Sequence, residues 1–185
     1  EFLDMKSEII NTNFENYEIK GDIEFRNVSY IYPNTGIKAL ENVSFSIKSG
    51  ESLAIMGKTG CGKTTIALLL CRLIDPTEGE ILVDGKNLKE HNLYLYRQHI
   101  GYVPQESYLF SDTIENNIGF AIDTPNIDTI IKYAKIADVD KNIIEFKDQY
   151  HTMVGERGVM LSGGQKQRIC IARALIKQPT ILIFD

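Results

Sequence analysis

One glycine-rich stretch limits the fold more than any other feature of the chain. Residues 57–64 read Gly-Lys-Thr-Gly-Cys-Gly-Lys-Thr and fit the spacing G-x-x-x-x-G-K-[ST]. A short apolar run at 53–56 precedes the stretch, and a longer one at 66–74 follows it until Asp75-Pro76. This order predicts a strand, a loop and a buried helix, which is the context that a phosphate-binding loop requires. The sequence therefore predicts an α/β fold.

The residue types in this loop suit the binding of phosphate groups. Glycines let successive backbone N–H groups face inward, and the N-terminus of the following helix adds positive potential. Lys63 can reach the outer phosphates of a nucleotide, and the Thr64 hydroxyl can bind Mg²⁺. The alternative is a glycine-rich turn with an unrelated lysine, and the flanking strand and helix patterns argue against it.

Apolar periodicity predicts the elements around this loop. Alternation of apolar and polar residues predicts half-buried strands near 23–25 and 43–47. Apolar residues at helical spacing over 127–137 predict a helix whose apolar stripe belongs to the core. The run of apolar and β-branched residues at 180–184 predicts a parallel strand that is buried on both faces and ends at Asp185.

Composition places the chain among ordinary globular proteins and excludes several functions. Of its 185 residues, 43% are hydrophobic and 24% are charged, which excludes disordered, collagen-like and disulfide-scaffold classes. The formal net charge is −5 and no basic patch stands out, so no nucleic-acid partner is expected. The longest apolar run, 66–71, is far shorter than the roughly 20 residues of a membrane-spanning helix.

A second glycine-containing segment opens a predicted helix in the last part of the chain. Residues 161–165 read Leu-Ser-Gly-Gly-Gln and precede a helix predicted over 166–176, with Ser162 and Gln165 at the spacing of a capping box. Two adjacent glycines at a helix start also leave backbone N–H groups open to a phosphate. Taken alone, the segment favours a plain helix cap, and a second anion site stays open as the alternative.

The order of these segments resembles the nucleotide-binding domain of an ATP-binding cassette (ABC) transporter across essentially the whole chain. The phosphate loop, Gln105, the Leu-Ser-Gly-Gly-Gln segment and the final Ile-Leu-Ile-Phe-Asp follow one another as they do in that family. Residues 154–158 (VGERG) and residues 1–4 (EFLD) resemble the exporters within it. The resemblance implies a P-loop NTPase (RecA-like) core with an antiparallel β subdomain and a helical subdomain.

The same resemblance implies an order of parts along the chain. Residues 1–20 are expected to be a linker from a transmembrane domain, with an antiparallel β subdomain and the P-loop core at 21–105. The helical subdomain is expected at 106–160. Residues 161–185 are expected to supply the signature helix and the Walker B strand of the core.

The resemblance also assigns roles to individual residues. Tyr32 is expected to stack on adenine, Gln105 to contact Mg²⁺ and the attacking water, and Asp185 to bind the Mg²⁺ shell. The implied ATP-binding residues are Tyr32, Gly57, Thr59, Gly60, Cys61, Gly62, Lys63, Thr64, Thr65 and Gln105. The implied Mg²⁺ ligands are Thr64, Gln105 and Asp185, and the signature residues are Leu161, Ser162, Gly163, Gly164 and Gln165. Lys63 and Gln105 are expected to contribute to catalysis, with ATP and Mg²⁺ as cofactors.

The resemblance implies two protein partners and no nucleic acid. The signature residues are expected to contact ATP bound to a second nucleotide-binding domain, so that two domains close head to tail around two nucleotides. The facing domain gains its best contacts only with the γ-phosphate present, so hydrolysis would release the closed state. The implied function is the ATPase domain of an exporter, joined in one polypeptide to a transmembrane domain and located at the cytoplasmic face of the cell membrane.

Two residues of the family pattern lie beyond the last residue of this sequence. The family places a glutamate that polarises the attacking water directly after the strand-end aspartate, and a histidine that contacts the γ-phosphate further on. His91, His99 and His151 precede the signature and do not match that histidine. Because a positioned proton acceptor contributes about 10²- to 10⁴-fold, we expect these residues alone to bind ATP with little or no hydrolysis. We also expect a C-terminally truncated chain that lacks a strand between those ending at Met56 and Asp185.

Two other classes of function are alternatives to the exporter domain. The first is a soluble ABC-type ATPase that acts on nucleic acid or ribosomes, which the acidic balance and the exporter-like opening argue against. The second is a degenerate regulatory module that binds ATP without hydrolysis, and the residue after Asp185 would decide it.

Overall fold

The computed structural model describes residues 9–155 and 158–185 of the chain. The chain forms two units, Glu1–His99 and Ile100–Asp185. Each unit has its own sheet and its own buried residues, and helices accompany strands in both. The predicted α/β class is therefore confirmed.

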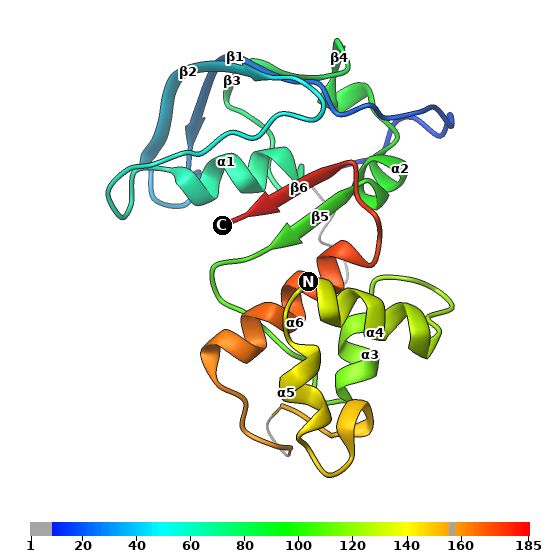
Figure 1. Ribbon diagram of the computed structural model, residues 1–185. Coiled ribbons are helices and arrows are strands. Elements are labelled where there is room, and N and C mark those ends of the chain that lie inside the picture. The colour runs from blue at the N-terminus through cyan, green and yellow to red at the C-terminus, as the bar shows by residue number, and fades with distance from the viewer. Residues whose placement is uncertain (1–8, 156–157) are drawn as a thin grey trace, which may run out of the picture. The chain divides into compact units, whose positions relative to one another are not determined.

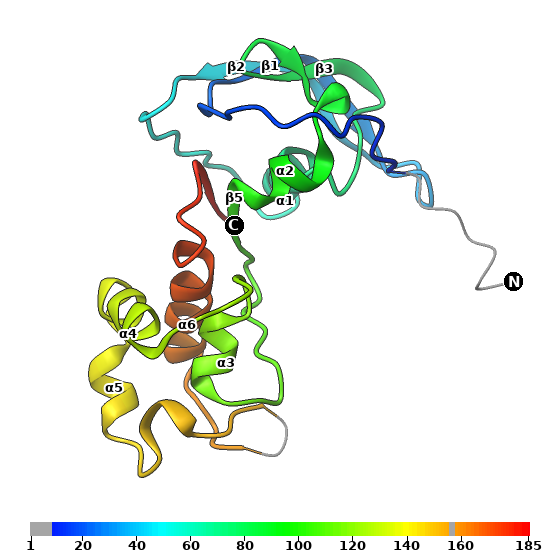
Figure 2. The ribbon, with the colours of Figure 1, turned by 90° about the vertical axis from the view of Figure 1, so that its right-hand side faces the viewer.

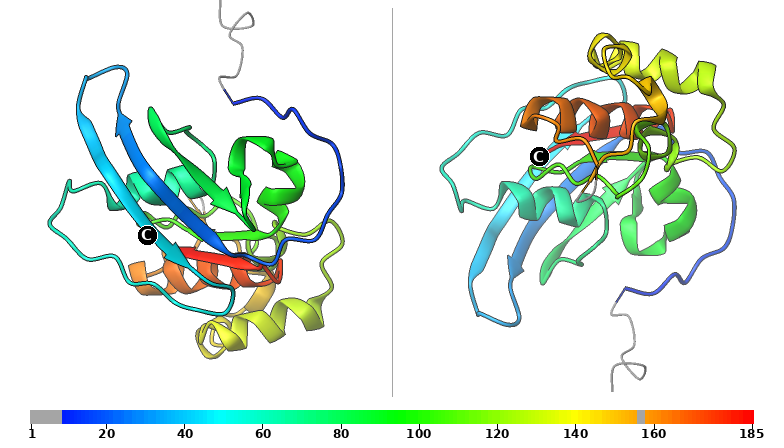
Figure 3. Two further views of the ribbon diagram at one scale, coloured as in Figure 1. Left: turned by 90° about the horizontal axis from the view of Figure 1, so that it is seen from above. Right: turned by 90° about the horizontal axis from the view of Figure 1, so that it is seen from below.

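The first unit is built on an antiparallel sheet whose described strands run in the order β2-β1-β3-β4 (Figures 1 and 3). These strands are β1 (Ile23–Ile31), β2 (Lys38–Ile47), β3 (Glu78–Val83) and β4 (Lys86–Asn87). Phe25 in β1 lies opposite Phe45 in β2 and Ile81 in β3, and the two phenylalanine rings stack with centroids 4.4 Å apart. The strands predicted near 23–25 and 43–47 are confirmed, and the apolar residues of β2 there are half-buried.

Helix α1 (Lys63–Leu70) begins within the glycine-rich loop and runs beside the sheet (Figure 1). The prediction of a helix over 66–74 is wrong in its bounds, because the helix begins and ends earlier. Arg72 has a φ of 48°, and the N–H groups of Arg72 and Leu73 donate to the carbonyls of Leu69 and Leu68. These two bonds form a Schellman motif, which ends a helix by reversing the backbone.

The strand predicted at 53–56 is not formed. Leu53, Ile55 and Met56 are 49%, 42% and 91% exposed, and no strand among the described residues includes them. A strand exists through its ladder of hydrogen bonds to a neighbour, and an apolar run without a paired neighbour gains neither those bonds nor burial. The prediction was wrong because it used the apolar run at 53–56 alone, and an apolar run does not determine whether a neighbouring strand pairs with it.

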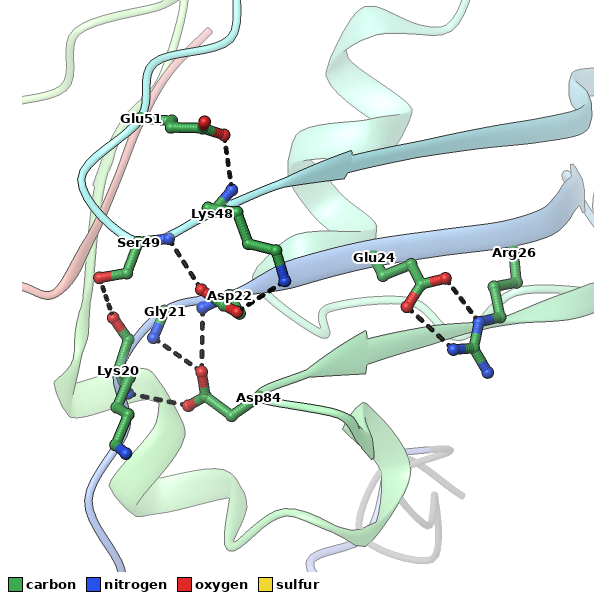
Figure 4. A network of polar contacts seen from close by, with 9 residues as sticks. All are labelled: Lys20, Gly21, Asp22, Glu24, Arg26, Lys48, Ser49, Glu51 and Asp84. Atoms are coloured by element: carbon green, nitrogen blue, oxygen red, sulfur yellow. Dashed lines mark hydrogen bonds and ion pairs between the residues drawn. The ribbon is translucent and has the colours of Figure 1, made fainter.

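The residues before β1 lie along the first unit without forming a helix or strand of their own. The Asp84 carboxylate accepts hydrogen bonds from the backbone N–H groups of Lys20, Gly21 and Asp22 at 2.8–3.0 Å (Figure 4). The Asp22 carboxylate in turn accepts from the N–H of Ser49, and its other oxygen forms an ion pair with Lys48. The entry to β1 is therefore fixed between the turns after β2 and β3.

The buried His91 lies between η2 (Leu88–Glu90) and α2 (Leu93–Gln98) and binds the segment that precedes β1. His91 is 2% exposed, and its Nε2 lies 3.1 Å from the Val83 carbonyl oxygen, so Nε2 carries the proton. Its Nδ1 accepts from the Tyr17 hydroxyl at 2.7 Å, and that hydroxyl accepts from the Asn92 N–H at 2.8 Å. These bonds require a neutral imidazole, and burial lowers the pKa of His91.

The second unit combines a parallel strand pair with a group of helices (Figure 2). The strands are β5 (Ile100–Val103) and β6 (Ile181–Phe184), with Val103 opposite Phe184. The helices are α3 (Ile114–Gly119), α4 (Ile127–Ile136), α5 (Asp140–Ile144), the 3₁₀ turn η3 (Gln149–His151) and α6 (Gly163–Leu175). Their core includes Ile114, Ala134, Ile143, Ile169 and Ala172.

Two predictions in the second unit need correction. The strand at 180–184 is parallel as predicted, but Leu182 and Phe184 are 38% and 59% exposed, so it is not buried on both faces. Among the described strands β6 pairs with β5, and one neighbour covers less of a strand than two. The helix over 127–137 is confirmed with Ala134 in the core, whereas Ile127 at its first position is 43% exposed.

We predict that Asp84→Asn destabilises the first unit. The amide keeps one acceptor oxygen and tolerates the φ of 52° at this position, but it replaces the other acceptor by a donor that faces N–H groups. The free energy of unfolding should fall by about 1–3 kcal/mol in urea titrations. Asp123→Asn at an exposed position is the control, and equal midpoints for the two variants would contradict the role of Asp84.

We predict that acid weakens the first unit through His91. Because burial lowers the pKa of His91 in the folded chain, the unfolded chain binds the proton more readily. The contribution of neutral His91 to the free energy of unfolding is complete above the ordinary histidine pKa of about 6.5, and it decreases as the pH falls below that value. The melting temperature should therefore fall from pH 7.5 to pH 5.5, and His91→Gln should reduce that fall. His151→Gln, on a side chain that is 76% exposed, should not reduce it.

Candidate functional site

The loop at 57–62 presents its backbone at the start of α1. Gly60 and Gly62 have φ values of 83° and 93°, in the left-handed region that favours glycine. A Cβ on Gly62 would lie 2.5 Å from the Ala39 carbonyl oxygen, so the sheet itself requires glycine there. Gly62 is also the N-cap of α1, and as a glycine it has no side chain that could cap the N–H groups that follow. The first turn of α1 is thus open to an anion.

Lys63 folds back over this loop. Its Nζ donates to the carbonyl oxygens of Gly57 and Lys58 at 2.9 Å each, and it lies 3.7 Å from Sγ of Cys61. The ammonium group and the uncapped N–H groups of α1 therefore belong to one short stretch of backbone. This arrangement concentrates positive potential where the sequence predicts phosphate groups.

The predicted ATP-binding residues beside the loop differ in their exposure to solvent. Thr64 is exposed, whereas Thr65 is buried and its hydroxyl lies 3.1 Å from that of Tyr32. The half-buried Tyr32 ring meets Tyr30 edge to face with centroids 5.0 Å apart. The structure thus brings Tyr32 to the helix that carries the loop, and the stacking of Tyr32 on adenine stays a prediction.

The second unit places Gln105 and Asp185 at one edge of the strand pair. Asp185 follows β6 directly, Gln105 comes two residues after β5, and parallel strands end at the same edge of a sheet. The Asp185 N–H donates to the Val103 carbonyl at 3.0 Å, and its carboxylate accepts from the Tyr102 hydroxyl at 3.2 Å. Gln105 is exposed. Both side chains offer oxygen ligands of the kind that Mg²⁺ prefers.

The signature segment forms the capped start of α6, three residues earlier than predicted. The Ser162 hydroxyl accepts from the Gln165 N–H at 3.2 Å, and the Gln165 side chain accepts from the Ser162 N–H at 2.9 Å. The predicted capping box is confirmed. Leu161 is buried, and a Cβ on Gly163 would meet nothing within 4 Å. Packing of the described residues therefore does not require glycine at 163.

Some sequence features fall outside what the structure describes. Residues 1–4 and the pair Glu156–Arg157 of the VGERG run lie outside the described residues. No group of three or more His, Cys, Asp or Glu side chains in 9–155 and 158–185 could hold a metal ion. In the same two ranges, every helix is too short or too polar to cross a membrane.

Two polar residues that no sequence motif marks contact the segment after Gln105. Arg173 on α6 and Asn117 on α3 are joined by hydrogen bonds of 2.6 and 2.7 Å, and both contact the segment that follows Gln105. No local pattern marks them, because they are 56 positions apart in the sequence.

Comparison with known proteins gives matches over most of the chain. The family described as "ABC transporter" matches residues 40–185. "ABC transporter B family member 6" of Dictyostelium discoideum is 46% identical over 182 residues, which are 95% of this chain and 27% of that protein. The "ATP-dependent lipid A-core flippase" of Photorhabdus laumondii is 43% identical over 184 residues, which are 99% of this chain and 32% of that protein.

A solved structure shares the fold of this chain. The "Structure of a bacterial Atm1-family ABC exporter with ATP bound" matches with a TM-score of 0.92 and 39% identity, over 100% of this chain and 33% of that chain. The predicted fold, that of an ABC nucleotide-binding domain, is confirmed. The chain spans about a third or less of the length of each of these three proteins.

We predict that bound nucleotide protects Cys61 from alkylation. Cys61 is exposed within the loop, whereas Cys71 and Cys170 are buried and serve as internal controls. With Mg-ATP at about 10 times its Kd, the labelling rate of Cys61 should fall about tenfold, because only the free tenth of the protein reacts. Mg-AMP, which lacks the outer phosphates, should protect much less. Mass spectrometry of the labelled peptides measures this, and equal rates with and without Mg-ATP would contradict it.

Proposed function

The chain belongs to the ABC transporter family, and from that premise we propose that it is the ATP-binding domain of an exporter. In this role it couples the binding and hydrolysis of ATP to transport across a membrane. The observation that carries the proposal is the uncapped start of α1 together with Lys63 on the loop carbonyls. The names of the similar flippase and exporter support transport as the purpose of ATP binding.

The residues present fit Mg-ATP. The loop and the start of α1 offer backbone N–H groups and an ammonium group for the phosphates, and Thr64, Gln105 and Asp185 offer the hard oxygen ligands that suit Mg²⁺. When bound, Mg²⁺ neutralises negative charge on the phosphates. In this proposal Lys63 binds the outer phosphates, and Tyr32 stacks on the adenine. Gln105 orients the attacking water.

The glycine at the start of the signature helix supports contact with a partner domain. Open space at the Cβ position of Gly163 shows that this glycine is not needed for packing of the described residues, so its small size suits the close approach of another molecule. We therefore assign Leu161 to Gln165 to the ATP of a second nucleotide-binding domain, in a head-to-tail dimer. The capping box keeps the Ser162 hydroxyl at the start of α6, where such an ATP would meet it.

The proposal extends to the whole exporter. A transmembrane domain of the same polypeptide is the second partner, and the ATP-binding domain lies at the cytoplasmic face of the cell membrane. The exporter assignment is preferred to a nucleic-acid ATPase because the relatives named above are a flippase and an exporter, and because the net charge is −5. For these 185 residues by themselves we expect slow turnover, because the resemblance places the proton-accepting glutamate one position after Asp185.

We predict that Lys63→Ala weakens the binding of Mg-ATP at least tenfold. The substitution removes a positive charge and its charge-assisted hydrogen bonds to phosphate, and a tenfold change corresponds to about 1.4 kcal/mol. Isothermal titration calorimetry measures the Kd, with phosphate release followed in parallel. Lys58→Ala removes the same charge from the same loop and is the matched control, with an expected change below about threefold.

Each other outcome would contradict a different part of the proposal. Equal Kd values for Lys63→Ala and the unaltered chain would contradict the role of Lys63. Absence of binding by the unaltered chain would contradict nucleotide binding by these residues. Fast phosphate release that depends on Lys63 would contradict the expectation of slow turnover.

A further inference from the structure

The short loop that carries Gln105 is fixed by hydrogen bonds at both of its ends. Before the loop, the Val103 carbonyl accepts from the Asp185 N–H at 3.0 Å, which extends the pairing of β5 with β6. After the loop, the Tyr108 carbonyl accepts from Nη1 of Arg173 at 3.0 Å and from Sγ of Cys170 at 3.5 Å, both on α6. Gln105 therefore lies between one attachment to β6 and one to α6.

Arg173 uses three guanidinium nitrogens at this attachment. Besides the bond to Tyr108, its Nε donates to the Asn117 backbone carbonyl at 2.6 Å and its Nη2 to Asn117 Oδ1 at 2.7 Å. Its Cζ also lies 5.2 Å from the ring centroid of Phe110. A lysine has a single nitrogen and cannot reproduce this planar set of donors. The bonding pattern thus depends on arginine and not on positive charge alone.

Asn117 pairs with the backbone of the segment that follows the Gln105 loop. Its side chain is buried, with Oδ1 accepting from the Phe110 N–H at 2.9 Å and Nδ2 donating to the Phe110 carbonyl at 3.0 Å. Nδ2 also donates to the Thr113 carbonyl at 2.9 Å. The amide acts on Phe110 as a neighbouring strand would, and its hydrogen-bonding capacity is used.

Burial holds one residue of this segment, since Leu109 is 8% exposed and belongs to the core of the second unit. Tyr108 is 66% exposed and Phe110 is 37% exposed, so apolar contacts leave much of both rings uncovered. The polar bonds to Arg173 and Asn117 fix the backbone on either side of Leu109. The same guanidinium belongs to α6, whose first turn is the signature segment.

We infer that Arg173 and Asn117 are a positioning pair that keeps the Gln105 loop in register with the signature helix. This inference rests on the proposed function and names a regulation of that same site. A displacement of Gln105 would reach the start of α6 through Tyr108 and Arg173, because a hydrogen-bonded helix moves as a rigid element. The link also acts in reverse, so that contacts made by Ser162 and Gly163 influence the position of Gln105.

The test is a double-mutant cycle between Arg173 and Gln105 in the complete polypeptide, reconstituted in lipid vesicles. Arg173→Lys should lower kcat for ATP hydrolysis about tenfold to a hundredfold, since a small misplacement of a positioning group costs up to about that much. KM for ATP should stay within about twofold. If Arg173 acts through Gln105, the double variant should be no slower than Gln105→Ala alone, so that the two effects are not additive.

Two further variants separate positioning from stability. Tyr150→Phe removes a 2.6 Å hydrogen bond to Asp140 in the same unit and should leave kcat unchanged. Asn117→Asp keeps the acceptor for Phe110 and Arg173 but loses the Nδ2 donors, and it should repeat the kcat effect if Arg173→Lys does not fold. Circular dichroism melts of every variant report whether the fold persists.

The outcomes distinguish this inference from the proposed function. Additive losses in the double variant, or an unchanged kcat with a lowered melting temperature, would overturn the positioning pair. An unchanged kcat in Gln105→Ala would overturn it too, since no catalytic group would remain to be positioned. Turnover that persists in Lys63→Ala would instead refute the proposed function, whatever the cycle shows.

Discussion

The open N-terminus of α1 is the constraint on which the rest of the first unit depends. An uncapped helix start is costly unless water or a ligand satisfies its N–H groups, and Gly62 gives it no side chain to do so. The sheet fixes this arrangement, because the Ala39 carbonyl and the buried Leu40 leave no room for a Cβ at 62. Strand pairing in β1 and β2 therefore determines how the phosphate loop is presented.

The starts of α1 in the first unit and of α6 in the second unit are capped in different ways. At α6, Ser162 and Gln165 satisfy each other's backbone N–H groups, so part of the helix start is capped by the chain's own side chains. At α1, the N-cap Gly62 has no side chain to cap the first turn, and the Lys63 ammonium group donates to loop carbonyls instead. This difference agrees with the proposal that the loop binds the nucleotide of this chain, whereas the signature residues contact the nucleotide bound to a second domain.

Single polar side chains fix the irregular segments in both units. Asp84 accepts three backbone N–H groups before β1, and Asn117 satisfies both backbone groups of Phe110. Irregular backbone has no ladder of its own, so its polar groups need side-chain partners or water. One well-placed carboxylate or amide can therefore set the course of several residues that carry or precede functional groups.

The sequence by itself determined the features whose cause is local. The loop spacing, the capping box of Ser162 and Gln165, and the alternation in β1 and β2 depend on neighbours within a few positions, and all were predicted. Only the tertiary structure decided the exposure at 53–56 and in β6, because burial of a strand depends on which strands pair beside it. It likewise decided the pairs Tyr17–His91 and Asn117–Arg173, which are separated by 74 and 56 positions. Such contacts arise from the folding of distant segments against each other, and no periodicity along the chain encodes them.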